Sequence, residues 1–144
     1  MYKFQRTISK PISLSGIALH SGKISNVTIK PAYSNFGIVF YRNDLQSNNL
    51  IEANIKNIAE SELCTKIANE HNSYVSTIEH LMSAFAFLGI DNAYVYTDGN
   101  EMPIMDGSSK TFIETIEQSG IIVKAKHKRV VGVSRHPRRH EIQN

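Results

Sequence analysis

The sequence predicts an α+β fold: a mostly antiparallel sheet that carries two helices on one face. Two observations predict it. Short segments of alternating apolar and polar residues occupy most of the first 70 positions and recur at 93–97. Apolar residues at helical spacing then appear in two stretches, 76–90 and 109–119. The chain has 144 residues, 41% of them hydrophobic, which suits one domain with a real core.

The strand predictions follow from alternation and from the turn residues that bound each run. Pro11 interrupts the first extended segment, since proline favours a sheet edge or a break. Asn and Gly clusters separate the later runs. We expect strands within 4–19, 23–31, 37–42, 51–58, 63–70 and 93–97, with 63–70 as the antiparallel neighbour of 51–58.

The first helix is predicted in the segment STIEHLMSAFAFLGI. Its apolar stripe has the spacing i, i+3, i+4 and i+7, and consists of Ile78, Leu81, Met82 and Phe85. Ser76 and Glu79 fit a capping box at its start, and Gly89 is suited to end it. The second helix is expected near 109–119, with Phe112, Ile113 and Ile116 on its buried face.

Charge divides the chain into two parts. Residues 1–123 hold nine Lys and Arg against twelve Asp and Glu, a net of −3. Residues 124–144 hold seven Lys and Arg against one acid, a net of +6, and show no helical stripe. We therefore predict an α+β domain over 1–123. The basic tail over 124–144 is either poorly ordered or a continuation cut short.

Composition also indicates a compartment. No apolar run approaches the roughly 20 residues that span a bilayer, and the first residues have no signal-peptide core. A single cysteine, Cys64, excludes an internal disulfide and is compatible with a reducing environment. These features favour a cytoplasmic protein.

A few polar residues could carry chemistry. Glu79 and His80 are adjacent in the first helix, where an imidazole could bind zinc and a carboxylate could take a proton from metal-bound water. Taken singly, the pair is a weak signal, because Glu79 is also explained as a capping residue and His80 as a partly buried, satisfied histidine. His20 lies in a loop of small residues, and Asp106 could orient a histidine or simply start a turn.

Four stretches together resemble a known family. They are GIALHSGK, ELCTKIAN, STIEHLMSAFAFLGIDN and EMPIMDGSSKTF, in this order. Over residues 4–123 they are similar to the amino-terminal half of the UDP-3-O-acyl-N-acetylglucosamine deacetylases. These are zinc amidases of lipid A (lipopolysaccharide) biosynthesis in Gram-negative bacteria. The resemblance implies one of two similar α+β domains, with the active site in the cleft between them.

The resemblance also implies roles for individual residues. Glu79 matches the general base and His80 matches one zinc ligand. Leu63 and Cys64 match residues that line the active-site wall. His20 and Asp106 match motifs near the cleft, where we expect supporting roles.

The family's remaining zinc ligands belong to an HKxxD motif in its second half, which also carries the oxyanion-stabilising lysine and the general-acid histidine. Here HKR at 127–129 does not match that motif, because Val131 stands where its aspartate should be. We therefore expect a truncated form that is inactive alone. Two alternatives stay open: a non-enzymatic binding module whose basic tail contacts RNA or an acidic partner, and a domain that associates with a separately encoded second half.

Overall fold

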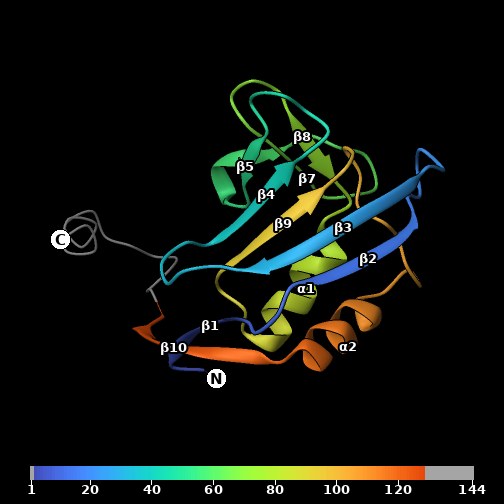
Figure 1. Cartoon of the computed structure of the whole chain (residues 1–144). Coiled ribbons are helices and arrows are strands. Elements are labelled where there is room, and N and C mark those ends of the chain that lie inside the picture. The colour runs from blue at the N-terminus through green and yellow to red at the C-terminus, as the bar shows by residue number, and fades with distance from the viewer. Residues whose placement is uncertain (1, 129–144) are drawn as a thin grey trace.

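A five-stranded sheet forms the framework of the domain (Figure 1). The computed structural model describes residues 2–128. The strand order is β2-β3-β9-β4-β5, and β4 and β9 run parallel while the other neighbours are antiparallel. The strands are β2 (Ile12–Ile17), β3 (Ile24–Pro31), β9 (Ala93–Thr97), β4 (Ile38–Arg42) and β5 (Leu50–Glu52). The mostly antiparallel α+β sheet predicted from the sequence is confirmed.

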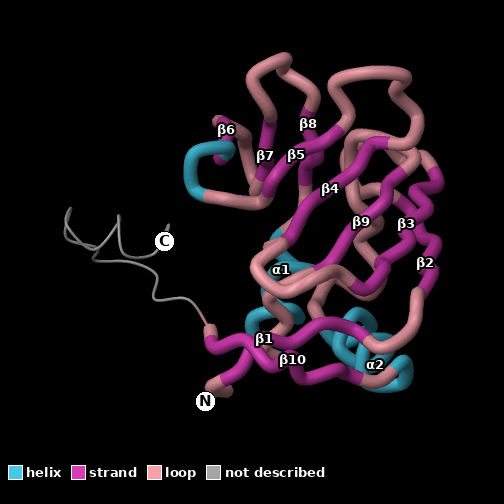
Figure 2. The backbone as a smooth tube through the Cα atoms, turned by 60° about the vertical axis from the view of Figure 1, so that its left-hand side comes forward, coloured by secondary structure: helices cyan, strands magenta, loops and turns pink. Residues whose placement is uncertain are grey.

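Two helices, α1 (Glu79–Leu88) and α2 (Lys110–Ser119), lie side by side against one face of this sheet (Figures 1 and 2). The alternation of β9 shows why that face is covered. Val95 points into the core, whereas Tyr94 and Tyr96 lie half-buried on the opposite face. The core is completed by Val27, Ile29, Phe40 and Ile51 from the sheet, Leu81, Ala84, Phe85 and Leu88 from α1, and Phe112 and Ile116 from α2.

Two small sheets flank the main one. β1 (Phe4–Ile8) pairs antiparallel with β10 (Ile121–His127), and β7 (Lys66–Ala68) pairs with both β6 (Ile58–Ala59) and β8 (Tyr74–Ser76). The prediction of one strand over 51–58 is wrong. Asn54 accepts a hydrogen bond from the Asn57 N–H through its side chain, which caps a 3₁₀ turn η1 (Ile55–Asn57) between β5 and β6.

The carboxyl-terminal end of the domain differs from the prediction. We expected the domain to end at residue 123, but β10 continues to His127 and the Lys128 N–H donates to the Lys3 carbonyl at 2.9 Å. Backbone pairing with β1 orders this stretch although its side chains are mostly charged and exposed. The rest of the predicted basic tail, 129–144, lies outside the described residues.

No helix within residues 2–128 is long and apolar enough to cross a membrane.

Candidate functional site

The predicted pair Glu79 and His80 occupies the first turn of α1, directly after β8. The predicted capping box does not form. The cap residue is Ile78, which makes no side-chain capping bond, and the Ser76 hydroxyl donates instead to the Asn100 carbonyl at 3.2 Å. Ser76 cannot cap the helix because it still belongs to β8. Glu79 is therefore free to use its carboxylate elsewhere.

The Glu79 carboxylate binds a neighbouring loop. Its Oε1 accepts a hydrogen bond from the Thr65 backbone N–H at 3.0 Å, while the Ile78 N–H donates to the Thr65 carbonyl at 3.3 Å. Oε2 lies outside this hydrogen bond. Two bonds to one residue thus join the start of α1 to the loop before β7, and they orient the Glu79 side chain.

The loop before β7 also carries the two predicted wall residues, Leu63 and Cys64. They directly precede Thr65, the residue whose N–H contacts the Glu79 carboxylate. Leu63 is 93% exposed, the largest exposed fraction among the exposed large apolar side chains within residues 2–128. Cys64 is partly buried, and its Sγ lies 2.9 Å from the Ser61 hydroxyl oxygen. Their role in contacting substrate stays a prediction.

His20 is held by a residue that sequence reasoning missed, Glu101. The Glu101 carboxylate accepts the backbone N–H of His20 at 2.8 Å and that of Ser21 at 3.1 Å, and its Oε2 lies 3.0 Å from Nδ1 of the His20 ring. Glu101 stands inside the EMPIMDGSS motif, but nothing in the sequence distinguishes it from a surface acid. Its 6% exposure is a property of the folded chain.

These contacts perturb the Glu101 carboxyl. Burial, the largest influence, acts to raise its pKa. The hydrogen bonds from the two amides and the His20 ring together outweigh burial, so the pKa lies below its ordinary value. Glu101 is consequently a carboxylate, an acceptor only, at neutral pH.

Asp106 makes a local turn. It is exposed and accepts hydrogen bonds from the Ser108 N–H at 3.0 Å and the Ser108 hydroxyl at 2.9 Å, which lower its pKa. Of the two alternatives left open by the sequence, the turn before α2 is the one its contacts show. A supporting role at the cleft stays a prediction.

Backbone strain gathers beside the predicted site residues. Three non-glycine residues other than asparagine adopt positive φ among residues 2–128: Leu63 (62°), Thr77 (60°) and Met105 (53°). Each lies one or two positions from Cys64, Glu79 or Asp106. Such conformations cost energy and are typical of functional sites whose surroundings hold them in place.

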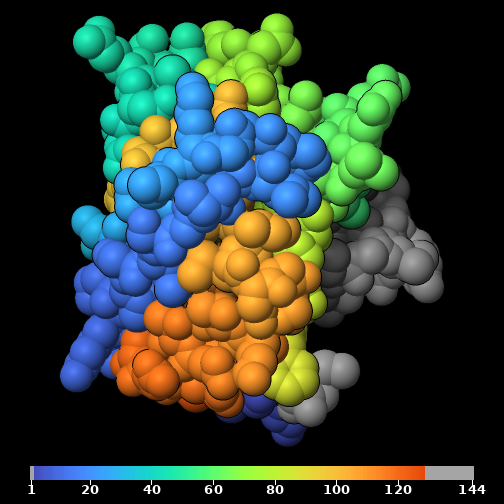
Figure 3. Space-filling model, turned by 90° about the vertical axis from the view of Figure 1, so that its right-hand side faces the viewer, coloured from blue at the N-terminus to red at the C-terminus, as the bar shows by residue number. Residues whose placement is uncertain are grey.

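The segments that carry these residues meet on one face of the molecule. Figure 3 shows α1 as a strip between the orange α2 and the green segment around residue 60, beneath the blue turn between β2 and β3. Ser76 joins two of these segments, because it pairs with Glu101 in an isolated bridge beside β8. The His20 loop and the start of α1 are thus connected through Glu101.

The described residues do not complete a zinc site. Residues 2–128 contain no group of three or more His, Cys, Asp or Glu side chains that could hold a metal ion. A catalytic zinc usually takes three protein ligands. His80 can supply one imidazole nitrogen, so the other donors would have to come from outside these residues.

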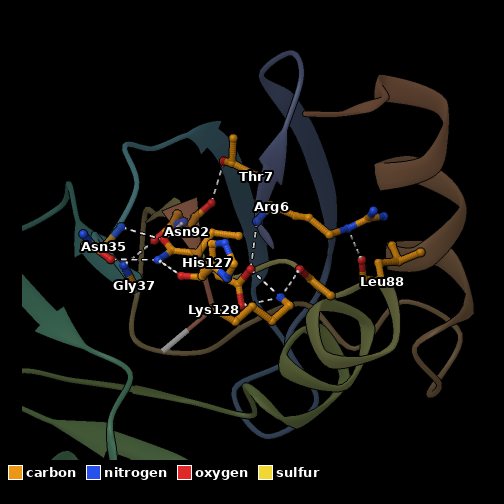
Figure 4. Close-up of polar contacts among 11 residues, drawn as sticks. Arg6, Thr7, Asn35, Gly37, Leu88, Asn92, His127 and Lys128 are labelled. Carbon is orange, nitrogen blue, oxygen red and sulfur yellow. Dashed lines mark hydrogen bonds and ion pairs between the residues drawn. The ribbon is translucent and has the colours of Figure 1, made fainter. Parts of the chain in front are cut away.

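Polar contacts fix the opposite end of α1 (Figure 4). The Arg6 Nε donates to the Leu88 carbonyl at 3.1 Å. The Lys128 ammonium donates to the Gly89 carbonyl at 3.2 Å and pairs with Asp91 at 2.5 Å. Two cations at the carboxyl-terminal end of a helix also interact favourably with its dipole.

Comparison with known proteins agrees with these motifs. A family model described as UDP-3-O-acyl N-acetylglycosamine deacetylase matches residues 5–143. The UDP-3-O-acyl-N-acetylglucosamine deacetylase of Idiomarina loihiensis is 41% identical over 129 residues, which are 90% of this chain and 42% of the relative. That of Shewanella sp. is 41% identical over 132 residues, or 92% of this chain and 43% of the relative.

Two facts follow from these matches. The chain spans less than half the length of the curated relatives it matches. The family match also continues through the basic segment to residue 143, so the similarity does not stop at 123 as the motifs indicated. The chain belongs to the UDP-3-O-acyl N-acetylglycosamine deacetylase family.

Proposed function

We propose that this chain supplies the general base and one zinc ligand of a deacetylase that hydrolyses the N-acetyl group of UDP-3-O-acyl-N-acetylglucosamine, releasing acetate, in lipid A synthesis. The observation that carries the proposal is the pair Glu79 and His80 at the start of α1, with Glu79 oriented by the Thr65 N–H. The relatives' names supply the substrate and the reaction.

Glu79 would act through one oxygen. Its Oε1 is engaged by the Thr65 amide, which leaves Oε2 to accept a proton from the attacking water. Zinc, when bound, would polarise the amide carbonyl and lower the pKa of water. Fixing one carboxylate oxygen restricts the side chain to few orientations, which would keep Oε2 pre-positioned to accept that proton.

His80 would contribute one of the zinc ligands, and the missing donors would come from residues outside 2–128. With one donor, zinc affinity is expected to be low and turnover by the 144-residue chain alone small. The wall formed by Leu63 and Cys64 would lie next to the Glu79 carboxylate because Thr65 joins the two.

A chimera tests this function. The carboxyl-terminal part of the Idiomarina loihiensis relative, from the end of the matched region onward, is supplied either fused to this chain or as a separate polypeptide. With zinc and the acylated UDP-sugar, we expect acetate release in the fused form. Release from the mixed form would show that two polypeptides suffice.

The matched control is Glu79→Gln, which keeps side-chain size and an acceptor for the Thr65 N–H but cannot take a proton. We expect acetate release to fall at least 100-fold, in the range typical of a lost general base. Bound zinc, measured by metal analysis, should persist in Glu79→Gln and decrease in His80→Ala. An active fused protein that Glu79→Gln leaves unchanged would contradict the proposal.

A further inference from the structure

We propose that Glu101 is a positioning residue that holds His20 with its proton on Nδ1, so that Nε2 is the ring atom offered to a bound ligand. The inference rests on the proposed function in placing His20 at the site. Its evidence is the geometry of the Glu101 carboxylate and does not involve zinc.

The Glu101 carboxylate is built into the fold from several sides. The Glu101 side chain is 6% exposed. Its backbone carbonyl accepts a hydrogen bond from the Ser25 hydroxyl at 2.7 Å, and its backbone pairs with that of Ser76. The backbone of Glu101 is therefore held independently of the His20 loop, and its buried side chain reaches from this fixed position to His20 and Ser21.

The carboxylate receives three donors from that loop. Oε1 accepts the Ser21 N–H at 3.1 Å, while Oε2 accepts the His20 N–H at 2.8 Å and lies 3.0 Å from His20 Nδ1. An ionised carboxylate has no hydrogen to donate. The Nδ1 contact is therefore a hydrogen bond only when Nδ1 carries the proton.

The consequence for the ring is a fixed tautomer. In a neutral imidazole one nitrogen donates and the other accepts, and the partner of the first decides the state of the second. With Nδ1–H bound to Glu101, Nε2 keeps its lone pair. The His20 side chain is 43% exposed, so the ring remains accessible while its orientation is held from the buried side.

The backbone of Glu101 also links the His20 loop to the segment that carries the predicted base. Glu101 pairs with Ser76, which lies three residues before Glu79, and the Met102 N–H donates to the Ser76 carbonyl at 3.0 Å. These backbone contacts between residues 101–102 and Ser76 restrict how far the His20 loop can move relative to the start of α1. Glu101 therefore acts on His20 and the loop, not on the reacting atoms.

The tautomer can be measured directly by long-range ¹H–¹⁵N correlation spectroscopy of the full 144-residue chain, at a pH where its histidines are neutral. We expect His20 to show a protonated Nδ1 and an unprotonated Nε2. His71 is the internal control, because its Nε2, not its Nδ1, faces the Glu70 carboxylate at 3.6 Å. A His20 spectrum with the proton on Nε2 would overturn the proposal.

Two variants separate positioning from general stability. In Glu101→Gln one carboxylate oxygen becomes an amide that cannot accept, and His20 should change from one tautomer to a mixture while His71 stays as it was. In His20→Ala the Glu101 bonds to the backbone remain. The amides of residues 20 and 21 should then keep slow hydrogen exchange.

The two variants also give results that would contradict the role of Glu101. A folded Glu101→Gln chain with unchanged His20 tautomer would show that Glu101 does not set it. If this variant fails to fold, the wild-type tautomer and the exchange in His20→Ala still test the proposal, and fast exchange there would contradict it. None of these measurements uses substrate or metal, so failure here is distinguishable from failure of the deacetylase function.

Discussion

Thr77 combines backbone strain with an unsatisfied polar atom, two residues before Glu79. Its φ is 60°, its exposure is 3%, and its hydroxyl has no hydrogen-bond partner among the described residues. A β-branched residue in the left-handed region costs about 1–2 kcal/mol. The strain allows the chain to leave β8 and enter α1 within two residues, which places Glu79 beside Thr65.

The Thr77 hydroxyl should therefore lower stability. Replacing it in Thr77→Val keeps the shape and removes a buried, unpaired group, so the free energy of unfolding should rise by about 1 kcal/mol. Urea denaturation of the full chain measures the change.

Thr7 offers the matched control. Its hydroxyl donates to the Asn92 carbonyl at 2.6 Å and accepts the Ala32 N–H at 3.1 Å in a fully buried position. Thr7→Val should lower the free energy of unfolding by about 1–3 kcal/mol, because two buried groups lose their partner. The same sign of change for both substitutions would refute the assignment of the Thr77 hydroxyl as unpaired.

Glu101 should make stability depend on pH. Its pKa is depressed in the folded chain, so its contribution is present above its unfolded pKa and is lost as pH falls through the folded pKa. At pH 7, Glu101→Gln should lower the free energy of unfolding by about 1.5–3 kcal/mol, as for a hydrogen-bonded charge.

Urea titrations from pH 7 to pH 3 should show this difference shrinking as the wild-type carboxylate is protonated. A difference that stays constant over this range would mean that the charge of Glu101 is not what holds the loop.

At the scale of elements, α1 is defined by contacts at both ends. Gly89 ends the helix with φ of 70°, and its N–H returns to the Phe85 and Ala86 carbonyls. A Cβ at this position would overlap the Tyr2 ring, which itself lies under the Arg6 guanidinium at 3.8 Å. The helix end is thus packed against the amino-terminal residues.

Gly89→Ala should consequently lower the free energy of unfolding more than Gly22→Ala does. Both glycines have φ near 70°, so alanine costs about 1–2 kcal/mol at either position. Gly22 has no atom within 4 Å of an added Cβ, whereas Gly89 adds the overlap with Tyr2.

The excess at Gly89 should vanish in a Tyr2→Ala background, measured as a double-mutant cycle of unfolding free energies. If the excess destabilisation persists in the Tyr2→Ala background, the overlap with the Tyr2 ring is not its cause.

Sequence patterns predicted the elements that have strong periodicity. Both helices, the strand over 93–97 and the stop at Gly89 are confirmed, because apolar spacing and a left-handed glycine are local signals. The split of 51–58 and the strand pairing of 121–127 were missed. Asn54 capping and pairing with β1 depend on geometry and on distant partners.

The candidate site was predicted only in part for the same reason. Motifs indicated Glu79 and His80, and the fold places them together on the first turn of α1. Glu101 was missed because its importance lies in burial and in bonds to residues 80 positions away. The capping box was predicted wrongly, since β8 reaches to Ser76 and Glu79 turns to Thr65 instead.

At the scale of the whole molecule, Asn92 connects the β1–β10 pair to the main sheet. It is 1% exposed, accepts the Gly37 N–H at 2.8 Å and donates to the Gln5 side chain at 3.0 Å (Figure 4). Gln5 in turn donates to the His127 carbonyl at 2.9 Å. The buried Asn92 amide therefore joins β1 to the turn before β4, and the Gln5 amide extends this connection to β10.

Removing the Asn92 amide should weaken the connection between the β1–β10 pair and the main sheet. Asn92→Ala should lower the free energy of unfolding by about 2–3 kcal/mol, because buried partners are left unsatisfied. Amide hydrogen exchange should accelerate most in β1 and β10.

Asn26→Ala is the control, since its amide group bonds Ser15 and Asp98 at the exposed surface. It should change stability by less than about 1 kcal/mol. Uniform acceleration of exchange across all strands in Asn92→Ala would argue against a local connecting role.

The pairing of β1 with β10 brings Phe4 opposite His127, so the two ends of the described domain are neighbours. Domains with adjacent ends tolerate circular permutation and insertion into other proteins. A short linker from residue 128 to residue 2 should therefore close the chain without breaking a strand, and new ends could be opened in the exposed loop between β4 and β5.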